Sequence, residues 1–557
     1  MSENDCKYVS SRGILKSCDI YSSTPISGIT HLINYDFSQI KENSIIYICV
    51  SAIPYFINNI FYKLPYNIIL VTGDNDETVP SDFFNKETGD FLRFIECDKL
   101  IHWYSQNCIL TTHPKITQMP IGLDYHTMST QDHLWGKQLS PLDQESMLEH
   151  IKLNSKPFYE REKKAYSNFH FFMGTKFGYD RINAKEQIPE ELVFYEPIRV
   201  ERELSWKTQT QYAFVISPHG NGLDCHRTWE ALCLGCIVIV KTSALDPLYE
   251  ELPVLIVKEW SNINQELLDN TIIEFKNKNF NNNKLNLKYW VNKIKSYRDA
   301  INIMKSKSVV ITGCCRNNDI YIKQNLNIID KIGQQFKEYK VIIYENDSND
   351  NTRQTLIENK KYNYDYIFED NINISNRTER IAYCRNKILQ QVNISNYTNY
   401  DYLLMLDLDD VLVSGKIIST IKSCFLYNST QWDAMFANCS DEYYDIYALR
   451  KKKYLTTCCW NNVYLSKQLG ISHEIAYERC INKYIINYPI YTKIMPVISA
   501  FGGAGLYKLS CILKTNATYN GYEPTHVDKQ ICEHVSFNTT LVKNSYKLYI
   551  NPRMLIR

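Results

Sequence analysis

Two acidic residues, Asp407 and Asp409, stand directly after the apolar segment 402–406. Side chains alternate along an extended chain, so residues two apart point to the same side. Two carboxylates held side by side repel each other unless a positive charge lies between them, and oxygen ligands suit a hard divalent cation that also contacts phosphate oxygens. The spacing therefore predicts a Mn²⁺ or Mg²⁺ site at the exit of a buried strand. The alternative is a solvated acidic turn that binds nothing.

Further polar residues belong to the same predicted crevice. Arg316 follows the first predicted strand of the C-terminal half, and Asp347 follows the second. In an open α/β sheet, residues after the strands line the ligand crevice. Arg316 could bind a diphosphate through two parallel hydrogen bonds, and Asp347 could accept hydrogen bonds from a base or ribose. Arg385, on the predicted helix before the acidic strand, is a third candidate. For each arginine the alternative is a surface salt bridge.

A glycine-containing loop at 217–232 is the second segment that could bind a phosphate. Gly220 and Gly222 permit close backbone approach and a positive φ. The helix predicted behind them offers free N–H groups and a positive dipole to a phosphate. Glu230, one turn further inside, could face back toward a ribose. The alternative is a tight strand–helix turn in which Glu230 is the buried partner of Arg227.

These residues need strands and helices to position them, and the hydrophobic pattern predicts an α/β fold. Apolar runs alternate with helix-length segments, which indicates parallel strands with crossover helices. The strands are expected at 45–50, 68–71, 99–103, 108–111, 168–173, 212–216, 237–240, 253–257, 308–312, 340–344, 364–368 and 402–406. The Asn- and Lys-rich stretch that follows 275 is the best boundary. We expect two α/β halves at 1–150 and 151–275, a linker or helix at 276–306 and a third α/β domain at 307–557.

The composition excludes several classes of protein. Hydrophobic residues make up 44% and charged residues 22% of the 557 residues, an ordinary globular balance. The formal net charge of +1 gives no reason to expect a nucleic-acid binder. The N-terminus is too polar for a signal peptide, and Pro54, Asn58 and Asn59 interrupt the uncharged stretch 45–62, so no transmembrane segment is expected. The 18 cysteines form no regular framework, which favours buried free thiols and a reducing, cytoplasmic location.

The ordered motifs of the C-terminal half resemble the GT-A glycosyltransferase fold, and most of all its eukaryotic capsule-associated mannosyltransferase-like branch. The resemblance covers about residues 307–545 and rests on a strand followed by Arg, the string Glu-Asn-Asp-Ser-x-Asp, an Ala-x-x-Arg-Asn helix and a strand ending in Asp-x-Asp. It implies that Asp407 and Asp409 hold Mn²⁺ or Mg²⁺ against the diphosphate of a nucleotide sugar.

The same resemblance implies a general base for the acceptor hydroxyl if the enzyme inverts. Glu533 and His534 occupy the place where such enzymes often carry an acidic pair. Glu533 is therefore the candidate base and His534 the candidate third metal ligand, although the two roles could be exchanged. Asp445, Asp441 and Glu442 are alternative bases. An ordinary surface pair remains the alternative for Glu533 and His534.

The N-terminal loop has a resemblance of its own. The string Ser-Pro-x-Gly-x-Gly-x-Asp-x-x-Arg-x-Trp-Glu-Ala-Leu from Ser217 resembles the donor-binding half of exostosin-like GT-B glycosyltransferases, over about residues 205–262. It implies that the loop lies near a diphosphate, with Arg227 paired to the diphosphate, Glu230 on the ribose hydroxyls and no bound metal. The loop residues concerned are His219, Gly220, Asn221 and Gly222. Residues 122–126 are a candidate part of the cleft, and no convincing base is evident in the first half.

Together these features predict a GT-B-like pair of Rossmann-like units followed by a GT-A nucleotide-sugar-binding domain. The expected function is a bifunctional glycosyltransferase that uses UDP- or GDP-sugars and a glycan or glycoprotein acceptor. One alternative is that only the C-terminal module is catalytic and the N-terminal module is a scaffold that binds a glycan or nucleotide. The other is a non-catalytic, lectin-like structural protein. The residue composition is typical of a low-GC genome and suggests that the protein comes from a giant DNA virus. The expected location is then the host cytoplasm, a viral factory or the virion.

Overall fold

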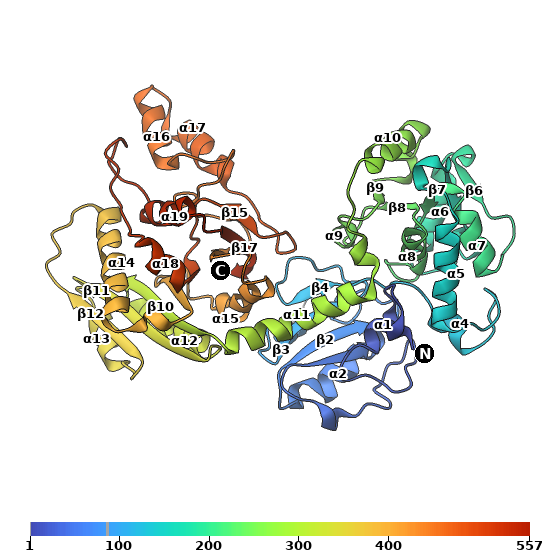
Figure 1. The fold of residues 1–557 in the computed structure, drawn as a ribbon, viewed down its shortest axis with the longest axis horizontal. Coiled ribbons are helices and arrows are strands. Elements are labelled where there is room, and N and C mark those ends of the chain that lie inside the picture. The colour runs from blue at the N-terminus through green and yellow to red at the C-terminus, as the bar shows by residue number, and fades with distance from the viewer. Residues whose placement is uncertain (1, 85–88) are drawn as a thin grey trace. The chain divides into compact units, whose positions relative to one another are not determined.

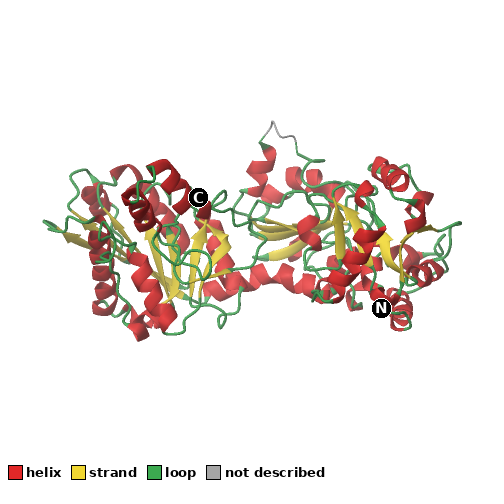
Figure 2. Ribbon diagram, turned by 90° about the horizontal axis from the view of Figure 1, so that it is seen from above, coloured by secondary structure: helices red, strands yellow, loops and turns green. Residues whose placement is uncertain are grey.

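The computed structural model describes residues 2–84 and 89–557. The chain forms two compact units, Met1–Ser296 and Tyr297–Arg557 (Figure 1). Both units are α/β, with yellow strands covered by red helices in Figure 2.

The first unit begins with a parallel four-stranded sheet in the order β1-β2-β3-β4. Every residue of its first three strands is buried, as expected of a parallel sheet covered on both faces. The strands are β1 (Ser44–Cys49), β2 (Ile68–Gly73), β3 (Leu100–Ser105) and β4 (Ile116–Gln118). The helices of this half are α1 (Ser11–Leu15), α2 (Ile53–Asn59), α3 (Asp90–Ile95), α4 (His126–Thr130) and α5 (Pro141–Leu153).

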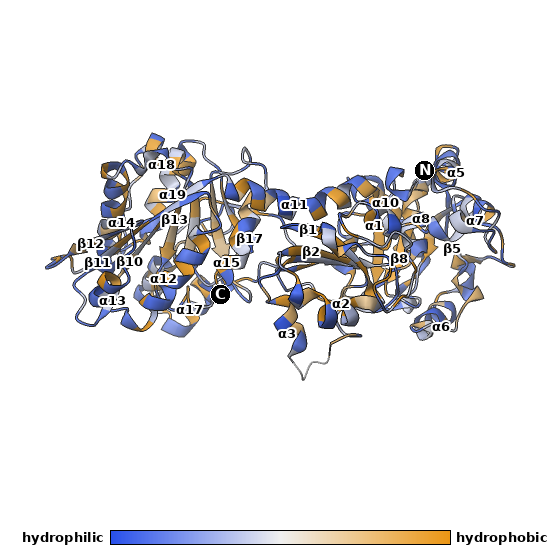
Figure 3. Ribbon diagram, turned by 90° about the horizontal axis from the view of Figure 1, so that it is seen from below, coloured by the Kyte–Doolittle hydropathy of each residue, from blue (hydrophilic) through white to orange (hydrophobic). Residues whose placement is uncertain are grey.

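A parallel five-stranded sheet follows in the same unit, in the order β6-β5-β7-β8-β9. Its strands are β5 (Glu162–Ser167), β6 (Val193–Tyr195), β7 (Tyr212–Ile216), β8 (Ile237–Lys241) and β9 (Val254–Val257). Its helices are α6 (Gly178–Gln187), α7 (Arg202–Gln209), α8 (His226–Cys233), α9 (Asp246–Tyr249), α10 (Gln265–Lys276) and α11 (Leu287–Lys305). Strands such as β1, β2 and β8 are largely hydrophobic in colour in Figure 3.

The second unit is built on an eight-stranded mixed sheet in the order β12-β11-β10-β13-β16-β14-β17-β15. The first four strands of that order are mutually parallel, and β16 and β15 run antiparallel to their neighbours. The strands are β10 (Ser308–Cys315), β11 (Glu338–Asn346), β12 (Tyr364–Glu369), β13 (Tyr402–Asp407), β14 (Ala434–Asn438), β15 (Met495–Val497), β16 (Ala504–Lys508) and β17 (Leu548–Leu555).

Alternating residues of these strands pack into two separate hydrophobic cores, one on each face of the sheet. Val310 and Leu403 belong to one hydrophobic cluster, and their neighbours Val309 and Leu404 belong to the other. The helices of the unit are α12 (Asp319–Gly333), α13 (Thr352–Glu358), α14 (Arg377–Ile394), α15 (Lys416–Thr420), α16 (Cys459–Gln468), α17 (His473–Cys480), α18 (Leu509–Thr515) and α19 (Glu533–Lys543).

Two of the predicted strands are wrong. Residues 108–111 form no strand, although Cys108 makes an isolated bridge with Val79. The aromatic run 168–173 contains the 3-10 helix Phe169–Phe171, and the strand lies just before it in β5. That strand starts with exposed charged residues, so its pattern carries little apolar signal.

The uncharged stretch 45–62 contains the strand expected at 45–50, as β1, and continues into α2. Across the described part of the chain, no helix combines the length and the apolar character that a membrane crossing requires.

Candidate functional site

The acidic residues of the second unit lie where its strand order switches. From β10 the chain proceeds outward through β11 and β12, and then returns to the other side of β10 as β13. Ligands of open α/β sheets bind at the carboxyl ends of strands at such a switch point. Asp407 is the last residue of β13 and pairs with Cys314 of β10.

Asp407 and Asp409 flank a buried residue, as the alternation predicted. Leu408 packs into the core above Gly313, where a Cβ on the glycine would lie 2.6 Å from Leu408 Cγ. Asp409 is exposed, and its Oδ1 accepts a hydrogen bond from the Val411 amide at 3.1 Å. Burial, together with the negative charges of Asp409, Glu533 and Asp445, raises the pKa of Asp407 to about 7 against the opposing effect of Arg385.

Arg385 of α14 is the cation of this site. Its Nη2 donates to Asp407 Oδ1 at 2.9 Å, and its Nη1 donates to Glu533 Oε1 at 2.5 Å. Its guanidinium lies over the ring of Phe501 at 4.8 Å from the centroid. A planar guanidinium can hold two carboxylates at once, so Arg385 fixes the position of Asp407 relative to Glu533.

The pair at the start of α19 faces Arg385. Both Glu533 and His534 are buried, so the surface-pair alternative is wrong. His534 Nε2 contacts Arg385 Nη1, and its ring stacks on Phe501 at 3.7 Å between centroids. Burial and Arg385 hold the pKa of His534 well below its usual range, so the neutral ring accepts from the arginine. His534 is engaged with Arg385, and the described residues contain no cluster of three or more His, Cys, Asp or Glu side chains arranged for a metal.

Asp445 is the fourth acid of the site. Its Oδ2 accepts from the Gly502 amide at 2.9 Å, and its Oδ1 accepts from the Ala448 amide at 3.2 Å. Burial raises the pKa of Asp445. Gly502 has a φ of 65°, and a Cβ there would lie 2.5 Å from Ala437 O, so this turn requires glycine.

The carboxylates of Asp407 and Asp409 are suitable ligands for a divalent cation that also binds the substrate. Asp407 and Asp409 supply hard oxygen ligands, and the negative charge around them exceeds what Arg385 alone offsets. Mg²⁺ and Mn²⁺ sites of this kind use one or two carboxylates and complete their coordination with phosphate oxygens and water. A pair of carboxylates at a strand end is therefore sufficient.

Arg316 and Asp347 lie together at the ends of β10 and β11. Arg316 Nε donates to the Asp347 carbonyl at 3.3 Å, and its side chain is exposed. The Asp347 carboxylate accepts from the Asn371 amide at 2.6 Å and from the Ile372 amide at 3.3 Å. Its hydrogen bond from Asn346, with those amides and Arg316, lowers the pKa of Asp347 against burial. Asp347 thus also holds the loop after β12.

The first unit contains a cleft of about 640 Å³ at the carboxyl ends of its strands. The second sheet has its own switch point between β5 and β7, and the glycine loop follows β7 there. Five of the six predicted loop and helix residues line the cleft: Gly220, Asn221, Gly222, Arg227 and Glu230. His219 is not among its lining residues, and its Nδ1 bonds the Leu223 carbonyl at 2.8 Å.

The two glycines allow close packing of neighbouring side chains and do not adopt a positive φ. Neither has a positive φ, which corrects that part of the prediction. A Cβ on Gly220 would lie 2.6 Å from Arg181 Nη2, and a Cβ on Gly222 would lie 2.8 Å from Asn107 Nδ2. The loop therefore packs closely on polar side chains from both halves of the unit.

Arg227 and Glu230 do not pair with each other in this arrangement. Glu230 Oε2 accepts from Trp206 Nε1 at 3.1 Å, and Glu230 Oε1 lies 3.5 Å from Arg202 Nη2. Arg227 Nη1 donates to Ser217 Oγ at 3.4 Å, and burial lowers its pKa. No ion pair among the described residues involves Arg227, and a part-buried guanidinium in that situation is suited to an anionic ligand.

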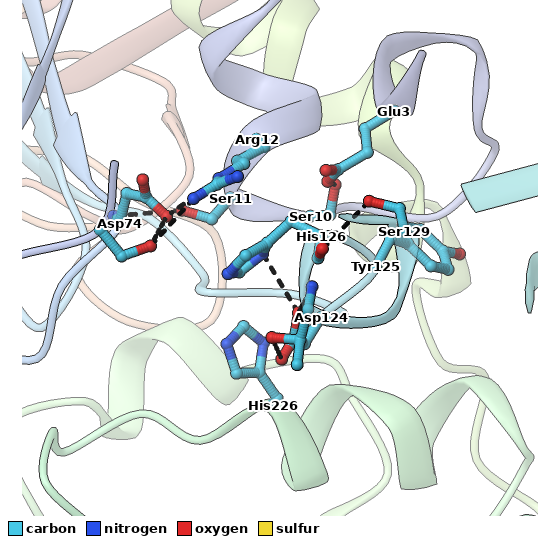
Figure 4. A network of polar contacts seen from close by, with 12 residues as sticks. Glu3, Ser10, Ser11, Arg12, Asp74, Asp124, Tyr125, His126, Ser129 and His226 are labelled. Atoms are coloured by element: carbon cyan, nitrogen blue, oxygen red, sulfur yellow. Dashed lines mark hydrogen bonds and ion pairs between the residues drawn. The ribbon is translucent and has the colours of Figure 1, made fainter. Parts of the chain in front are cut away.

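The segment 122–126, which was expected to be part of the cleft, is not among its lining residues, although Ile121 is; its polar side chains belong to the network of Figure 4. His226 Nδ1 bonds the Gly122 carbonyl at 2.7 Å, and His126 Nδ1 lies 3.1 Å from Asp124 Oδ1. Burial alone would raise the pKa of Asp124, but His226, His126 and Arg202 outweigh it and hold that pKa well below its usual range. Asp124 is thus an ionised structural centre.

Several cleft residues carry no sequence signal that identified them. Arg202 and Trp206 stand four apart on α7, a spacing that any amphipathic helix can have. Asp76, after β2, and Arg181, on α6, also line the cleft. The one usable hint is that Asp76 follows an apolar strand, like the aspartates of the second unit.

Comparison with known proteins gives a structural likeness only. No protein-family model and no curated protein matches the chain. The chain is similar to the mannosyltransferase PcManGT from Pyrobaculum calidifontis, solved in complex with GDP-Man and Mn²⁺. The identity is 11%, the TM-score is 0.26, and the match covers 48% of this chain and 64% of that one, which is less than two thirds of its length.

Two further solved structures resemble part of the chain. S. aureus TarS 1-349 in complex with UDP-GlcNAc shares 14% identity at a TM-score of 0.25, over 44% of this chain and 55% of that one. Glucosyl-3-phosphoglycerate synthase from Mycobacterium tuberculosis in complex with UDP shares 9% identity at a TM-score of 0.23, over 45% of this chain and 69% of that one. At these scores the likeness supports no statement about activity, which has to be argued from the residues of this chain.

Proposed function

We propose that the chain is a bifunctional glycosyltransferase that takes sugars from nucleotide-sugar donors, with a metal-dependent second unit of GT-A type. The observation that carries the proposal is the pair Asp407 and Asp409 at the switch point of the sheet, with Arg385 fixing Asp407. A divalent cation bound by the two aspartates would neutralise charge on the departing nucleoside diphosphate. The donor class is UDP- or GDP-sugars, and the acceptor is a glycan or glycoprotein.

The residues around the two aspartates have separable roles in this proposal. Arg316 binds the diphosphate, and Asp347 accepts hydrogen bonds from the ribose or base while its backbone holds Arg316. The candidates for the base that deprotonates the acceptor hydroxyl are Asp445 and Glu533. Asp445 is bonded only by backbone amides in the contacts described above, whereas Glu533 is paired with Arg385. His534 supports Arg385 in this arrangement, which is a different role from the third metal ligand that the resemblance implies.

For the first unit we propose an exostosin-like GT-B module that needs no metal. The proposal is supported by the cleft at the second switch point and by Arg227 and the N-terminus of α8 beside the glycine loop. Glu230, held by Trp206 and Arg202, is placed to bind ribose hydroxyls in this scheme. The domain division at 150, 275 and 306, the viral origin and the cytoplasmic or virion location stay predictions.

The test is a donor-turnover assay on the full chain. GDP-mannose and UDP-GlcNAc are supplied with Mn²⁺ or with EDTA, and release of GDP or UDP is measured. Asp409→Asn should remove the Mn²⁺-dependent turnover by at least about 100-fold, because a neutral amide binds a hard cation poorly. The neighbouring exposed Asp410→Asn is the matched control and should keep the wild-type rate.

The same assay separates the alternatives. Turnover that is insensitive to Asp409→Asn and to EDTA would refute the metal-dependent second unit. Loss of all turnover in Asp409→Asn would support a single active module with the first unit as a scaffold. No turnover with either donor, together with glycan binding, would support the lectin-like alternative. Asp445→Asn and Glu533→Gln in the same assay identify the base as the residue whose loss slows turnover without weakening Mn²⁺ binding.

A further inference from the structure

The cleft of the first unit contains four carboxylate side chains: Asp76, Glu196, Asp224 and Glu230. The sequence had offered no general base for this unit. A group that accepts a proton during transfer must reach the substrate with an oxygen that is not already committed to strong donors. The hydrogen bonds that each of the four carboxylates accepts therefore show which one could act as a general base.

Asp224 is committed to holding the unit together. It is fully buried, and its carboxylate accepts from Trp229 Nε1 at 2.8 Å, from Tyr249 Oη at 3.1 Å and from the Ile121 amide at 2.8 Å. These donors come from different parts of the unit. Asp224 consequently has a structural role.

Glu230 and Glu196 are committed as well. Glu230 bonds the indole of Trp206 and faces Arg202. Glu196 is buried, and its Oε2 accepts from Tyr166 Oη at 2.9 Å. Glu196 is buried, and the oxygens of Glu230 are engaged by Trp206 and Arg202, so neither offers a free oxygen to an acceptor hydroxyl.

Asp76 differs from these three. It follows β2 in the first half of the unit, and it lines the cleft together with Gly220 and Asn221 of the glycine loop. Its charged neighbours are His226, Arg181 and Lys176. It is half-buried at the cleft wall, so a ligand hydroxyl can approach it. Asp76 thus shares the cleft with the loop that the proposed function assigns to the diphosphate.

We propose that Asp76 is the general base of the first unit, and that this unit is therefore catalytic rather than a binding scaffold. The inference rests on the proposed function of the cleft as a nucleotide-sugar site. The Asp76 carboxylate takes the proton of the acceptor hydroxyl as that oxygen forms a bond to the anomeric carbon of the donor. The bond from that carbon to the diphosphate breaks, and its electron pair leaves on the nucleoside diphosphate beside Arg227.

His226 lies in the same cleft as Asp76. Its Nδ1 donates to the Gly122 carbonyl, since a carbonyl oxygen can only accept. The ring stands at the start of α8 and, in Figure 4, beside Asp124. Its proximity to Asp76 stabilises the carboxylate form against the burial that raises the pKa of Asp76.

The pH dependence of the reaction provides a second readout. The active form of the base is the carboxylate, and burial raises the pKa of Asp76 above its ordinary value of 3.8. Turnover by the first unit should therefore fall as the pH drops through that raised pKa. Replacing Asp76 with asparagine should remove this fall in turnover at low pH, together with most of the turnover rate of the first unit.

The experiment uses the full chain carrying Asp409→Asn, with EDTA present, so that the second unit is silent. GDP release from GDP-mannose and UDP release from UDP-GlcNAc are measured, and binding of GDP and UDP is followed by thermal shift. Adding Asp76→Asn should lower the remaining turnover by about 100-fold and leave nucleotide binding unchanged. Glu77→Gln is the matched control: it changes the adjacent carboxylate, which bonds Asn75 and does not line the cleft, and should keep the rate.

Each outcome of the experiment has one meaning. Unchanged turnover in Asp76→Asn would overturn the assignment of the base. Nucleotide binding without any metal-independent turnover in the Asp409→Asn background would overturn the inference that this unit is catalytic. Absence of both nucleotide binding and turnover would instead refute the proposed function of the cleft.

Discussion

At the residue scale, Arg385 organises the site of the second unit. The sequence suggested it as a ligand of the donor diphosphate, and the structure pairs it with Asp407 and Glu533, while His534 and Phe501 pack against it. A charged group this deeply buried is stable only when it is paired and hydrogen-bonded. The arginine therefore links the first aspartate of the acidic pair to α19.

We predict that Arg385→Lys destabilises the second unit by about 3 kcal/mol, because an ammonium cannot bond two carboxylates as the guanidinium fork does. The measurement is the urea midpoint of the unfolding transition of that unit. Arg380→Lys, an arginine on the same helix that bonds the Ser375 carbonyl in an exposed position, is the control and should change the midpoint little. An equal shift in both variants would contradict the bridging role.

At the element scale, short helices at the N-terminus bury a carboxyl group. Glu3 lies in the 3-10 helix Glu3–Asp5 (η1), and its Oε2 accepts from Ser10 Oγ at 2.8 Å at the N-cap of α1 (Figure 4). Burial raises the pKa of Glu3 from 4.5 to about 7, against the lowering effect of the Ser10 hydrogen bond. The folded state therefore holds a proton that the unfolded chain has already released at intermediate pH.

This difference has a definite sign. The stabilising contribution of protonated Glu3 is complete below pH 4.5 and is lost as the pH rises to about 7. Glu3→Gln stays neutral, so we predict that its stability relative to wild type rises over that window by roughly 3 kcal/mol. Urea unfolding of the first unit at both ends of the window measures the effect. The exposed Glu160→Gln should show no such trend, and a pH-independent difference for Glu3→Gln would count against the assignment.

At the scale of the whole molecule, the chain divides into two units, and the division falls within α11. The first part of this helix buries Trp290 and Ile294. Its last part supplies Ala300 and Met304 to a core cluster of the second unit. The helix is thus part of the packing of the second unit as well as a connection.

We therefore predict that a fragment 307–557 melts at a lower temperature than a fragment 287–557. Losing the buried apolar side chains of α11 removes about 3 kcal/mol of burial energy, which corresponds to roughly 6–12 °C in a unit of this size. Thermal unfolding of the two fragments measures this. Equal melting temperatures would mean that residues 287–306 add nothing to the second unit.

Much of the architecture could be predicted from local pattern. The apolar strands before Asp407 and before the glycine loop are β13 and β7, and Leu408 is buried between the two aspartates as alternation requires. Such patterns depend on neighbours a few residues apart. Strand β5 was not predicted, because its first residues are charged and give little apolar signal. The aromatic run after β5 was wrongly predicted as a strand, because its side chains line a cleft instead of belonging to a sheet.

The sequence by itself determined which strands end in polar residues. This is possible because the alternation of side chains along a strand, and the point where the strand ends, depend only on neighbouring residues. What only the tertiary structure decided is which distant side chains meet there. Arg385 and Glu533 are 148 positions apart, and Asp76 lines the same cleft as Asn221 from the other half of its unit. Such meetings depend on sheet order and helix packing, which no short-range pattern encodes. The base proposed for the first unit could therefore be identified only once the chain was folded.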